Sequence, residues 1–225
     1  MTESHWREEI CRVGKSLFDR GYVHGSAGNI SVRLPGDAGY LITPTDASLG
    51  ALDPARLARL DLQLRQQDGD RASKTIELHR RIYEAACPFD ADTRCVIHTH
   101  STHCVALTLQ PAAVEDNELL PALTPYFVMK VGHVPRIVYC RPGDVRAAEQ
   151  VARAIGAYGA RGTPIRAVML DRLGPNVWHS EPTAAMATLE ELEETARLWV
   201  LSAPKPLPLA PAQIEELRTT FGARW

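Results

Sequence analysis

The sequence predicts an α/β layered domain in which helices cover a mixed β-sheet. Apolar residues recur at helical spacing in two long segments, 6–17 and 182–201. Short apolar or alternating segments of strand length, such as 30–33 and 95–97, lie between them. Turn signals rich in proline and glycine, such as 34–37, join several of these strands. Strands mixed with helices and tight turns in this way are typical of a layered α/β domain.

The composition is that of an ordinary globular protein. Of the 225 residues, 45% are hydrophobic and 23% are charged, and the formal net charge is -2. This balance gives no electrostatic reason to expect binding to nucleic acid or to a membrane. No apolar run approaches the ~20 residues that span a bilayer. The charged N-terminus lacks the apolar core of a signal peptide.

The cysteines indicate a reducing compartment. The chain has five, an odd number, and no two are spaced as Cys-x-x-Cys. Neither a disulfide framework nor a zinc ribbon is predicted, and reduced thiols favour a cytoplasmic location. The cysteines are Cys11, Cys87, Cys95, Cys104 and Cys140.

The first elements are a helix and two strands. Segment 6–17 predicts an amphipathic helix, with Gly21 as its C-cap. Segments 30–33 and 40–43 predict strands that the turn at 34–37 separates.

Two polar loops border these strands. Ser26, Gly28 and Asn29 precede the first strand, in a loop that can turn tightly and aim N–H groups at a phosphate. An ordinary turn is the alternative interpretation. Thr45 and Asp46 form a second polar loop directly after the second strand.

A third candidate anion site begins the next long helix. Ser73, Lys74 and Thr75 lead into an apolar-periodic segment, 76–83. The free N–H groups of a helix N-terminus, together with the lysine cation, can bind an anion. The alternative is a capped helix that carries an exposed lysine.

The candidate metal ligands follow the buried strand 95–97. His98 and His100 are two residues apart, so in extended backbone they project to the same side. Two adjacent imidazoles can reach one divalent cation, with Zn–N distances of ~2.0–2.1 Å. A chance pair of exposed or hydrogen-bonded histidines is the alternative. His103 falls after the turn, in a helix that Ser101 caps, and is interpreted as a helix-start residue.

The remaining segments complete one domain. They predict a short helix at 53–60, a polar turn at 66–71, an irregular segment at 116–125, strands at 126–129, 137–140 and 166–170, a turn at 174–176, and helices at 145–155, 182–201 and 214–221. No internal repeat or clear linker divides the chain. We therefore expect a single domain over 1–225, with 203–225 as a C-terminal tail and short helix.

Five of these segments occur together and in order in one family: GSAGNISVR (25–33), LITPTD (41–46), SKTIELH (73–79), VIHTHSTHCVAL (96–107) and LEELEETARLWV (189–200). Through them the chain resembles the class II aldolase/adducin family. The match spans most of the chain and is more specific than any single motif. Within the family, ITPTDASLGALDPARLARLD, TPYFVMKVGHVP and YCRPGD look most like the 3-oxo-tetronate 4-phosphate decarboxylases.

The resemblance implies a three-layer α/β/α single domain with a mixed, largely antiparallel central sheet. It implies a cytoplasmic, zinc-dependent enzyme with one Zn²⁺ per chain, acting on a small phosphorylated sugar acid. It also implies a homotetramer whose sites lie at subunit contacts. By position it assigns phosphate binding to Ser26, Gly28, Asn29, Thr45, Asp46, Ser73 and Lys74.

Two positions depart from the family pattern. A third zinc histidine is expected in a His-Gly pair, where this chain has Leu173-Gly174, and leucine cannot ligate a metal. The acid/base glutamate of the aldolases is expected at Thr75, four residues before His79. Glu77 lies ~200° further around the helix and cannot take its place.

The missing glutamate is tolerable in a decarboxylase. Loss of CO₂ from a 3-oxo acid needs no base, because a Lewis-acidic zinc can stabilise the enediolate left behind. The expected product is dihydroxyacetone phosphate. The enediolate still needs a proton, from Lys74, from Tyr126 of a neighbouring subunit or from water. Lys74, Thr75 and Tyr126 are therefore the candidate catalytic residues.

The missing histidine leaves the third ligand open. We predict that His133 supplies it, with a hydrogen-bonded loop histidine as the alternative. His179 and His103 are weaker candidates. Two other functions also stay open: a class II sugar-phosphate aldolase or epimerase, and a non-catalytic, adducin-like binding module.

Overall fold

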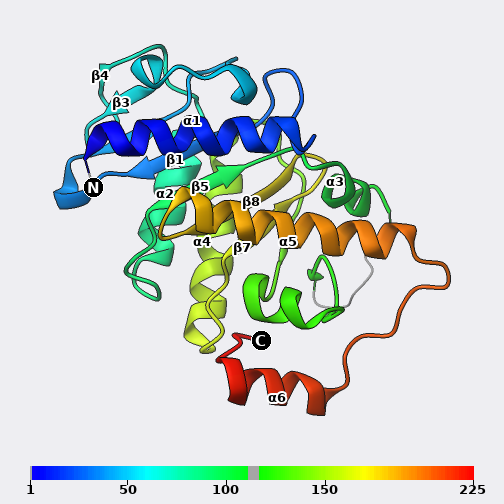
Figure 1. Cartoon of the computed structure of the whole chain (residues 1–225). Coiled ribbons are helices and arrows are strands. Elements are labelled where there is room, and N and C mark those ends of the chain that lie inside the picture. The colour runs from blue at the N-terminus through cyan, green and yellow to red at the C-terminus, as the bar shows by residue number, and fades with distance from the viewer. Residues whose placement is uncertain (1, 111–116) are drawn as a thin grey trace.

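A central β-sheet runs through the molecule in this computed structural model, which describes residues 2–110 and 117–225 (Figure 1). Its strands lie in the order β4-β3-β2-β1-β5-β8-β7-β6. Neighbours pair antiparallel except β6 and β7, which are parallel. The strands are β1 (Asn29–Arg33), β2 (Tyr40–Ile42), β3 (Ala58–Leu60), β4 (Gln66–Asp68), β5 (Cys95–His98), β6 (Arg136–Ile137), β7 (Ala167–Leu170) and β8 (Gly174–His179).

Helices cover both faces of this sheet. The α-helices are α1 (Glu3–Asp19), α2 (Ile76–Ala86), α3 (Thr102–Thr108), α4 (Val145–Ala160), α5 (Pro182–Leu201) and α6 (Pro211–Phe221). Shorter helical turns are η1 (Pro35–Asp37), η2 (Leu49–Ala51), η3 (Pro54–Arg56) and the π-helix η5 (Phe127–Val131). Figure 1 shows α1 and α5 on one side of the sheet, with α2 and α4 behind it.

Strand alternation divides the core between these two faces. Ile97 of β5 packs in one apolar cluster with Ile10 of α1 and Leu189 of α5. Its neighbour Val96 points the other way, into a second cluster with Ile82 of α2. The predicted three-layer α/β/α arrangement with a mixed, largely antiparallel sheet is therefore confirmed.

The helices at the two ends of the chain follow their sequence signals. Thr2 caps α1 by accepting a hydrogen bond from the backbone N–H of His5, and Gly21 follows the helix with φ 74°. The long helix predicted at 182–201 is α5, residue for residue. The predicted C-terminal helix is α6, which begins earlier, at Pro211, and contacts the π-helix η5.

Tertiary pairing overrides two local predictions near the sheet edge. The helix predicted over 53–60 stops at Arg56, and Leu60 lies instead in β3, opposite Tyr40 of β2. The polar segment predicted as a turn contains β4, whose residues are all exposed at the edge of the sheet. Polar residues can occupy an edge strand because one side of it faces solvent.

Three further predictions in the second half of the chain are wrong. Segment 126–129 lies at the π-helix η5 rather than in a strand, and only the first residue of 137–140 belongs to β6. Residues 174–176 begin β8, while the turn falls just before them, where Arg172 adopts φ 62°. Residue 116 of the predicted irregular segment lies outside the described residues. None of the described helices combines the length and apolar character needed to cross a bilayer.

Candidate functional site

The candidate site is built around two histidines at the end of β5. His98 is the last residue of the strand and His100 follows two residues later, and their ring centroids are 5.1 Å apart. Two imidazoles bound to one tetrahedral zinc through N–Zn bonds of ~2.0–2.1 Å have centroids about 5 Å apart. The observed spacing therefore fits a shared divalent cation.

The surroundings of His98 fix its protonation state and its tautomer. Burial, followed by the charge on His100, lowers the pKa of His98 to about 4, so the ring is neutral near pH 7. Its Nδ1 lies 3.0 Å from the carbonyl oxygen of Pro175. A carbonyl oxygen only accepts, so Nδ1 carries the proton and Nε2 keeps a free lone pair. Metal-binding histidines are typically oriented by such a bond.

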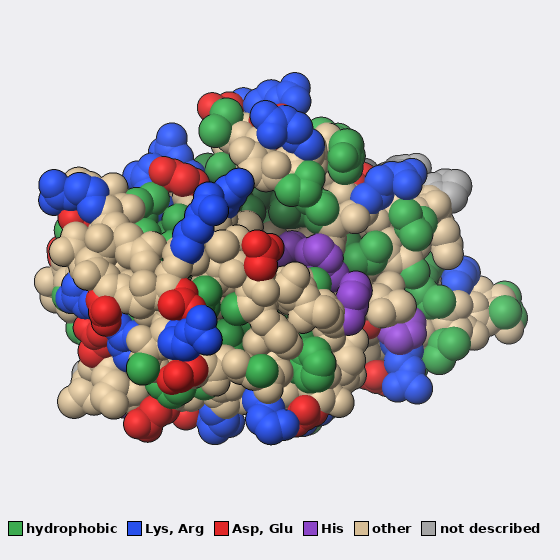
Figure 2. Space-filling model, turned by 90° about the horizontal axis from the view of Figure 1, so that it is seen from above, with side chains coloured by type: hydrophobic (Ala, Val, Ile, Leu, Met, Phe, Trp, Pro, Cys, Tyr) green, Lys and Arg blue, Asp and Glu red, His purple; other side chains and the backbone are tan. Residues whose placement is uncertain are grey.

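His100 is also poised as a neutral ligand. Burial, followed by the charge on His24, lowers its pKa. Within the described part of the chain, no side chain or backbone group hydrogen-bonds to its ring. Figure 2 shows histidine side chains, in purple, next to one another on the face seen from above.

A row of buried amides flanks His98. Asn29 of β1 and Asn176 of β8 are its direct partners in the two neighbouring strands, so all three side chains point to the same face. The Oδ1 of Asn29 and both side-chain polar atoms of Asn176 are buried without a hydrogen-bond partner among the described residues. Each such atom costs about 1–3 kcal/mol, and a ligand or water usually satisfies it.

His79 of α2 approaches the same face. Its Nδ1 lies 2.7 Å from the hydroxyl oxygen of Ser31, which also contacts the Tyr83 hydroxyl at 2.7 Å. Burial, then the charge on His98, lowers the pKa of His79 to about 3. Its buried Nε2 has no partner in the described structure. Sequence patterns do not single out His79 or Asn176, because only the packing of α2 and the β5–β8 register places them on this face.

The three loops predicted to bind phosphate converge beside this pair. Pro44 forms a β-bridge with Ala72, and the backbone N–H of Ser73 donates to the carbonyl of Thr43. Thr43 in turn exchanges hydrogen bonds with Ile30 at the start of β1. The loop at Thr45 and Asp46, the loop at Ser73 and Lys74, and the loop at 26–29 are thus held together.

Glycine is required where the first of these loops meets β5. Gly28 has φ 85°, and a Cβ at this position would lie 2.9 Å from the carbonyl oxygen of His98. Asp46 also adopts positive φ, 58°, which aspartate tolerates better than most residues. A cavity of about 500 Å³ lies next to this loop and is lined in part by Thr45, Asp46 and Arg71.

His133 is far from the histidine pair within the chain. β6 runs in the same direction as β5, so His133, which precedes β6, lies at the opposite end of the sheet from His98. Its ring stacks on Trp225 with centroids 4.4 Å apart, and its Nδ1 lies 3.2 Å from Glu118. Within one chain the fold therefore keeps His133 away from His98 and His100, with its ring held against Trp225 and close to Glu118.

His103 and His179, the weaker candidates for a third ligand, are also engaged elsewhere in the fold. The ring of His103 contacts Glu193 at 2.8 Å in the first turn of α3, as expected of a helix-start residue. His179 pairs with Cys95 at the far end of β5. Among the described residues, no group of three or more histidine, cysteine or acidic side chains lies close enough to hold a metal.

The remaining positions lie as follows. A Cβ on Gly174 would lie 1.9 Å from the carbonyl oxygen of Thr99, so the backbone at Gly174 packs directly against the histidine turn. Leucine fills the place where the resemblance expects a third histidine. Thr75 is the N-cap of α2, with its hydroxyl 2.9 Å from that of Ser73. Tyr126 is 61% exposed.

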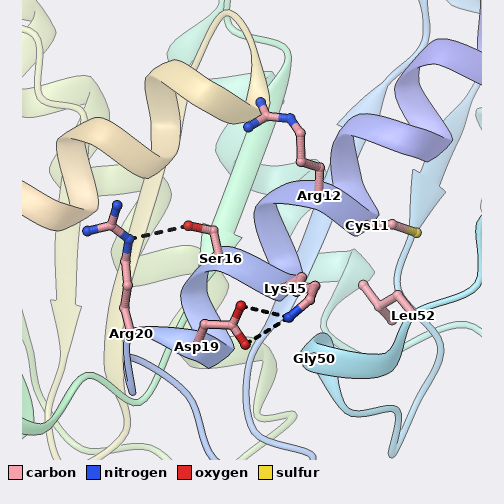
Figure 3. Close-up of a pocket in the computed structure, with 8 residues that line it drawn as sticks. All are labelled: Cys11, Arg12, Lys15, Ser16, Asp19, Arg20, Gly50 and Leu52. Atoms are coloured by element: carbon pink, nitrogen blue, oxygen red, sulfur yellow. Dashed lines mark hydrogen bonds and ion pairs between the residues drawn. The ribbon is translucent and has the colours of Figure 1, made fainter.

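A second cavity, of about 650 Å³, lies between α1 and η2, and none of its lining residues is a histidine (Figure 3). Its charged groups are already paired, since Lys15 binds Asp19 and Arg20 binds both Ser16 and Glu190. It therefore offers no unpaired lysine for an anionic substrate.

Comparison with known proteins decides the family. The model of the class II aldolase and adducin N-terminal domain matches residues 8–200. The chain belongs to the class II aldolase and adducin family. A Cupriavidus necator protein named 3-oxo-tetronate 4-phosphate decarboxylase is 49% identical, over 100% of this chain and 99% of its own. The Escherichia coli K12 protein of that name is 38% identical over 96% of this chain and 97% of its own.

Solved structures of the class II aldolase fold agree. The crystal structure of YgbL from Escherichia coli has a TM-score of 0.84 and 36% identity, covering 96% of this chain and 99% of that one. L-fuculose-1-phosphate aldolase from Thermus thermophilus has a TM-score of 0.70 and 25% identity, covering 89% and 98%. Class II aldolases are in general metal-dependent, which is consistent with the spacing of His98 and His100.

Proposed function

We propose that this protein is a zinc-dependent carboxy-lyase that converts a 3-oxo-tetronate 4-phosphate into dihydroxyacetone phosphate and CO₂. The similarity to relatives named for this reaction extends over the whole chain. The observation that carries the proposal is the neutral pair of His98 and His100, spaced for one cation beside three converging polar loops.

His98 and His100 would hold the metal. Bound zinc supplies a Lewis acid that takes up negative charge at the 3-oxo oxygen when CO₂ leaves. The Pro175 carbonyl keeps the His98 ring oriented, with Nε2 free for binding. The unpaired amide of Asn176, together with the Asn29 oxygen and the His79 nitrogen, offers hydrogen bonds to the hydroxyl and carboxylate groups of the substrate.

The three loops would hold the phosphate. Ser26, Gly28 and Asn29, then Thr45 and Asp46, then Ser73 and Lys74 supply short hydroxyl groups, backbone N–H groups and one cation. Lys74 is exposed and forms no ion pair within the described residues. The Asp46 carboxylate would repel a phosphate, so its backbone, at φ 58°, is the contact we propose.

Thr75 distinguishes decarboxylation from aldol cleavage. Retro-aldol cleavage removes a hydroxyl proton and needs a general base, which a threonine hydroxyl does not provide near neutral pH. Breaking the bond to a carboxylate needs no base, and only a proton donor afterwards. Lys74, Tyr126 of a neighbouring subunit or water is proposed for that role.

The assembly and location are proposed on two further observations. Large apolar side chains such as Tyr126, Val138 and Val145 are more than half exposed, which favours burial between subunits of a homotetramer. All five cysteines are free, which suits a reducing cytoplasm.

The test is incubation of the purified protein with 3-oxo-tetronate 4-phosphate and zinc. Equal yields of CO₂ and dihydroxyacetone phosphate are expected, with none from a His98→Asn variant. An aldolase would instead cleave a sugar 1-phosphate without releasing CO₂. A binding module would release neither product and would contain no stoichiometric zinc. Either result would refute the proposal.

A further inference from the structure

The histidine pair supplies two ligands, whereas a catalytic zinc usually has three from the protein. His103, His133 and His179 are held elsewhere by the fold. Leu173, directly before the Gly174 that packs against the histidine turn, has no donor atom. A third ligand must therefore come from another element close to His98 and His100. The inference below rests on the metal site proposed above.

His24 is a further imidazole next to this pair and, unlike the buried His79, it lies in an exposed loop. Its ring centroid lies 6.4 Å from that of His100, and the two ring planes are 77° apart. Its ring makes no hydrogen bond or ion pair in residues 2–110 and 117–225. The side chain is exposed, so it can change rotamer without breaking packing or a polar contact.

The backbone that carries His24 is fixed relative to the pair. Val23, next to it, is buried in the core, and the His24 carbonyl accepts a hydrogen bond from Ala27 in a closed turn. The same loop touches the carbonyl of His98 at Gly28 and then enters β1, where Asn29 pairs with His98. Only the side chain of His24 has to move.

The movement required is small. Two rings on one tetrahedral ion have centroids about 5 Å apart, against 6.4 Å between His24 and His100. Rotation about the two side-chain torsions of an exposed histidine displaces its ring by more than this difference of about 1 Å. We infer that His24 swings onto the cation held by His98 and His100 and becomes its third protein ligand.

A set of three imidazoles suits zinc and leaves one tetrahedral position open for substrate. Because the third ligand comes from a surface loop, it joins the site when the metal binds. The loop that carries His24 is also the loop proposed to contact phosphate, through Ser26, Gly28 and Asn29. The proposed ligand would therefore join the metal site to one wall of the substrate site.

The experiment measures metal binding without turnover. Zinc affinity is determined by competition with a chromophoric chelator for the wild type, His24→Gln and the matched control His5→Gln, which lies on α1. Removing an outer-sphere partner of a metal ligand typically costs 10–100-fold in affinity, so loss of a ligand should cost at least about 100-fold. His5→Gln should bind as the wild type does.

Cobalt replacing zinc gives a second readout. The visible absorption of four-coordinate cobalt should change in His24→Gln and stay unchanged in His5→Gln. Unchanged zinc affinity or an unchanged cobalt spectrum in His24→Gln would overturn the inference. If the wild type binds no zinc, or His98→Asn still binds it tightly, the metal site itself fails. Those outcomes are distinguishable from failure of His24 alone.

Discussion

Asn176 lies directly across from His98 in the β5–β8 ladder and buries both polar atoms of its side chain without a partner among the described residues. An amide left in this state destabilises the fold, because the water it loses is not replaced. Asn176 lies beside a candidate metal ligand on the same face of the sheet, where its amide can bind substrate or an ordered water. Hydrogen bonds to either would offset the loss of stability that the unpartnered amide causes.

Replacing Asn176 with leucine, which has a similar volume, should separate stability from activity. We expect the free energy of unfolding to rise by about 1–2 kcal/mol, because a buried unpaired amide is removed, while turnover falls. Chemical denaturation and CO₂ release measure the two effects. Ser31→Ala should act in the opposite direction on stability, since it removes a hydroxyl that contacts both His79 and Tyr83. A destabilised Asn176→Leu would refute this account.

His79 should make the stability of the metal-free protein dependent on pH. Its pKa is about 3 when folded and 6.5 in the reference state, so the unfolded chain binds the extra proton first. The contribution of neutral His79 to the free energy of unfolding is complete above pH 6.5 and is lost as the pH falls from 6.5 toward 3. Each pH unit within this window removes about 1.4 kcal/mol.

His79→Gln is the variant that tests this dependence. Urea denaturation of the wild type and the variant, with a chelator present, measures the free energy of unfolding at each pH. Between about pH 7 and about pH 5 this free energy should fall less for the variant than for the wild type. His98 titrates in both proteins, so the difference between them reports His79 together with its coupling to His98. Parallel stability curves for wild type and variant would contradict the burial of a neutral His79.

The elements that the sequence predicts best are those whose signal is local. The helical spacing of Trp6, Ile10, Val13 and Leu17 is sufficient for α1, because one apolar stripe must face the core. His98 and His100 could likewise be paired from strand alternation alone. The three polar loops also stand out in the sequence, because glycine and short polar residues cluster between strands.

The predictions that failed depend on partners distant in sequence. The distance of His133 from the histidine pair within the chain became visible only once β6 was known to run parallel to β7, which places it at the other end of the sheet. Asn176 looked like a turn residue until its register with His98 was visible. Leu60 joined β3 because Tyr40 of β2 pairs with it, whatever its local helical tendency.

Gly174 should be needed for the histidine turn. It has φ 140°, and a Cβ there would lie 1.9 Å from the Thr99 carbonyl oxygen. We expect Gly174→Ala to lower the unfolding free energy by more than about 1–3 kcal/mol, since strain and overlap combine, and to weaken zinc binding by moving His100. Gly156→Ala is the control. It lies in α4 with nothing within 4 Å, so it should be neutral or stabilising. Equal effects of the two substitutions would refute the prediction.

Lys74 should act on substrate binding through its charge. Its ammonium group has no ion pair among the described residues, and Lys74 lies in the chain between Ser73 and Thr75, the N-cap of α2. Loss of one charge-assisted hydrogen bond to phosphate is worth about 1.5–3 kcal/mol, so Lys74→Ala should raise KM roughly 10- to 100-fold. Lys15→Ala removes a lysine already paired with Asp19 and should leave KM unchanged.

Salt dependence gives a second measurement. Added salt should raise the wild-type KM more than that of Lys74→Ala, because salt screens the contact between lysine and phosphate, which only the wild type has. An unchanged KM in Lys74→Ala, or equal salt dependence, would exclude a direct phosphate contact.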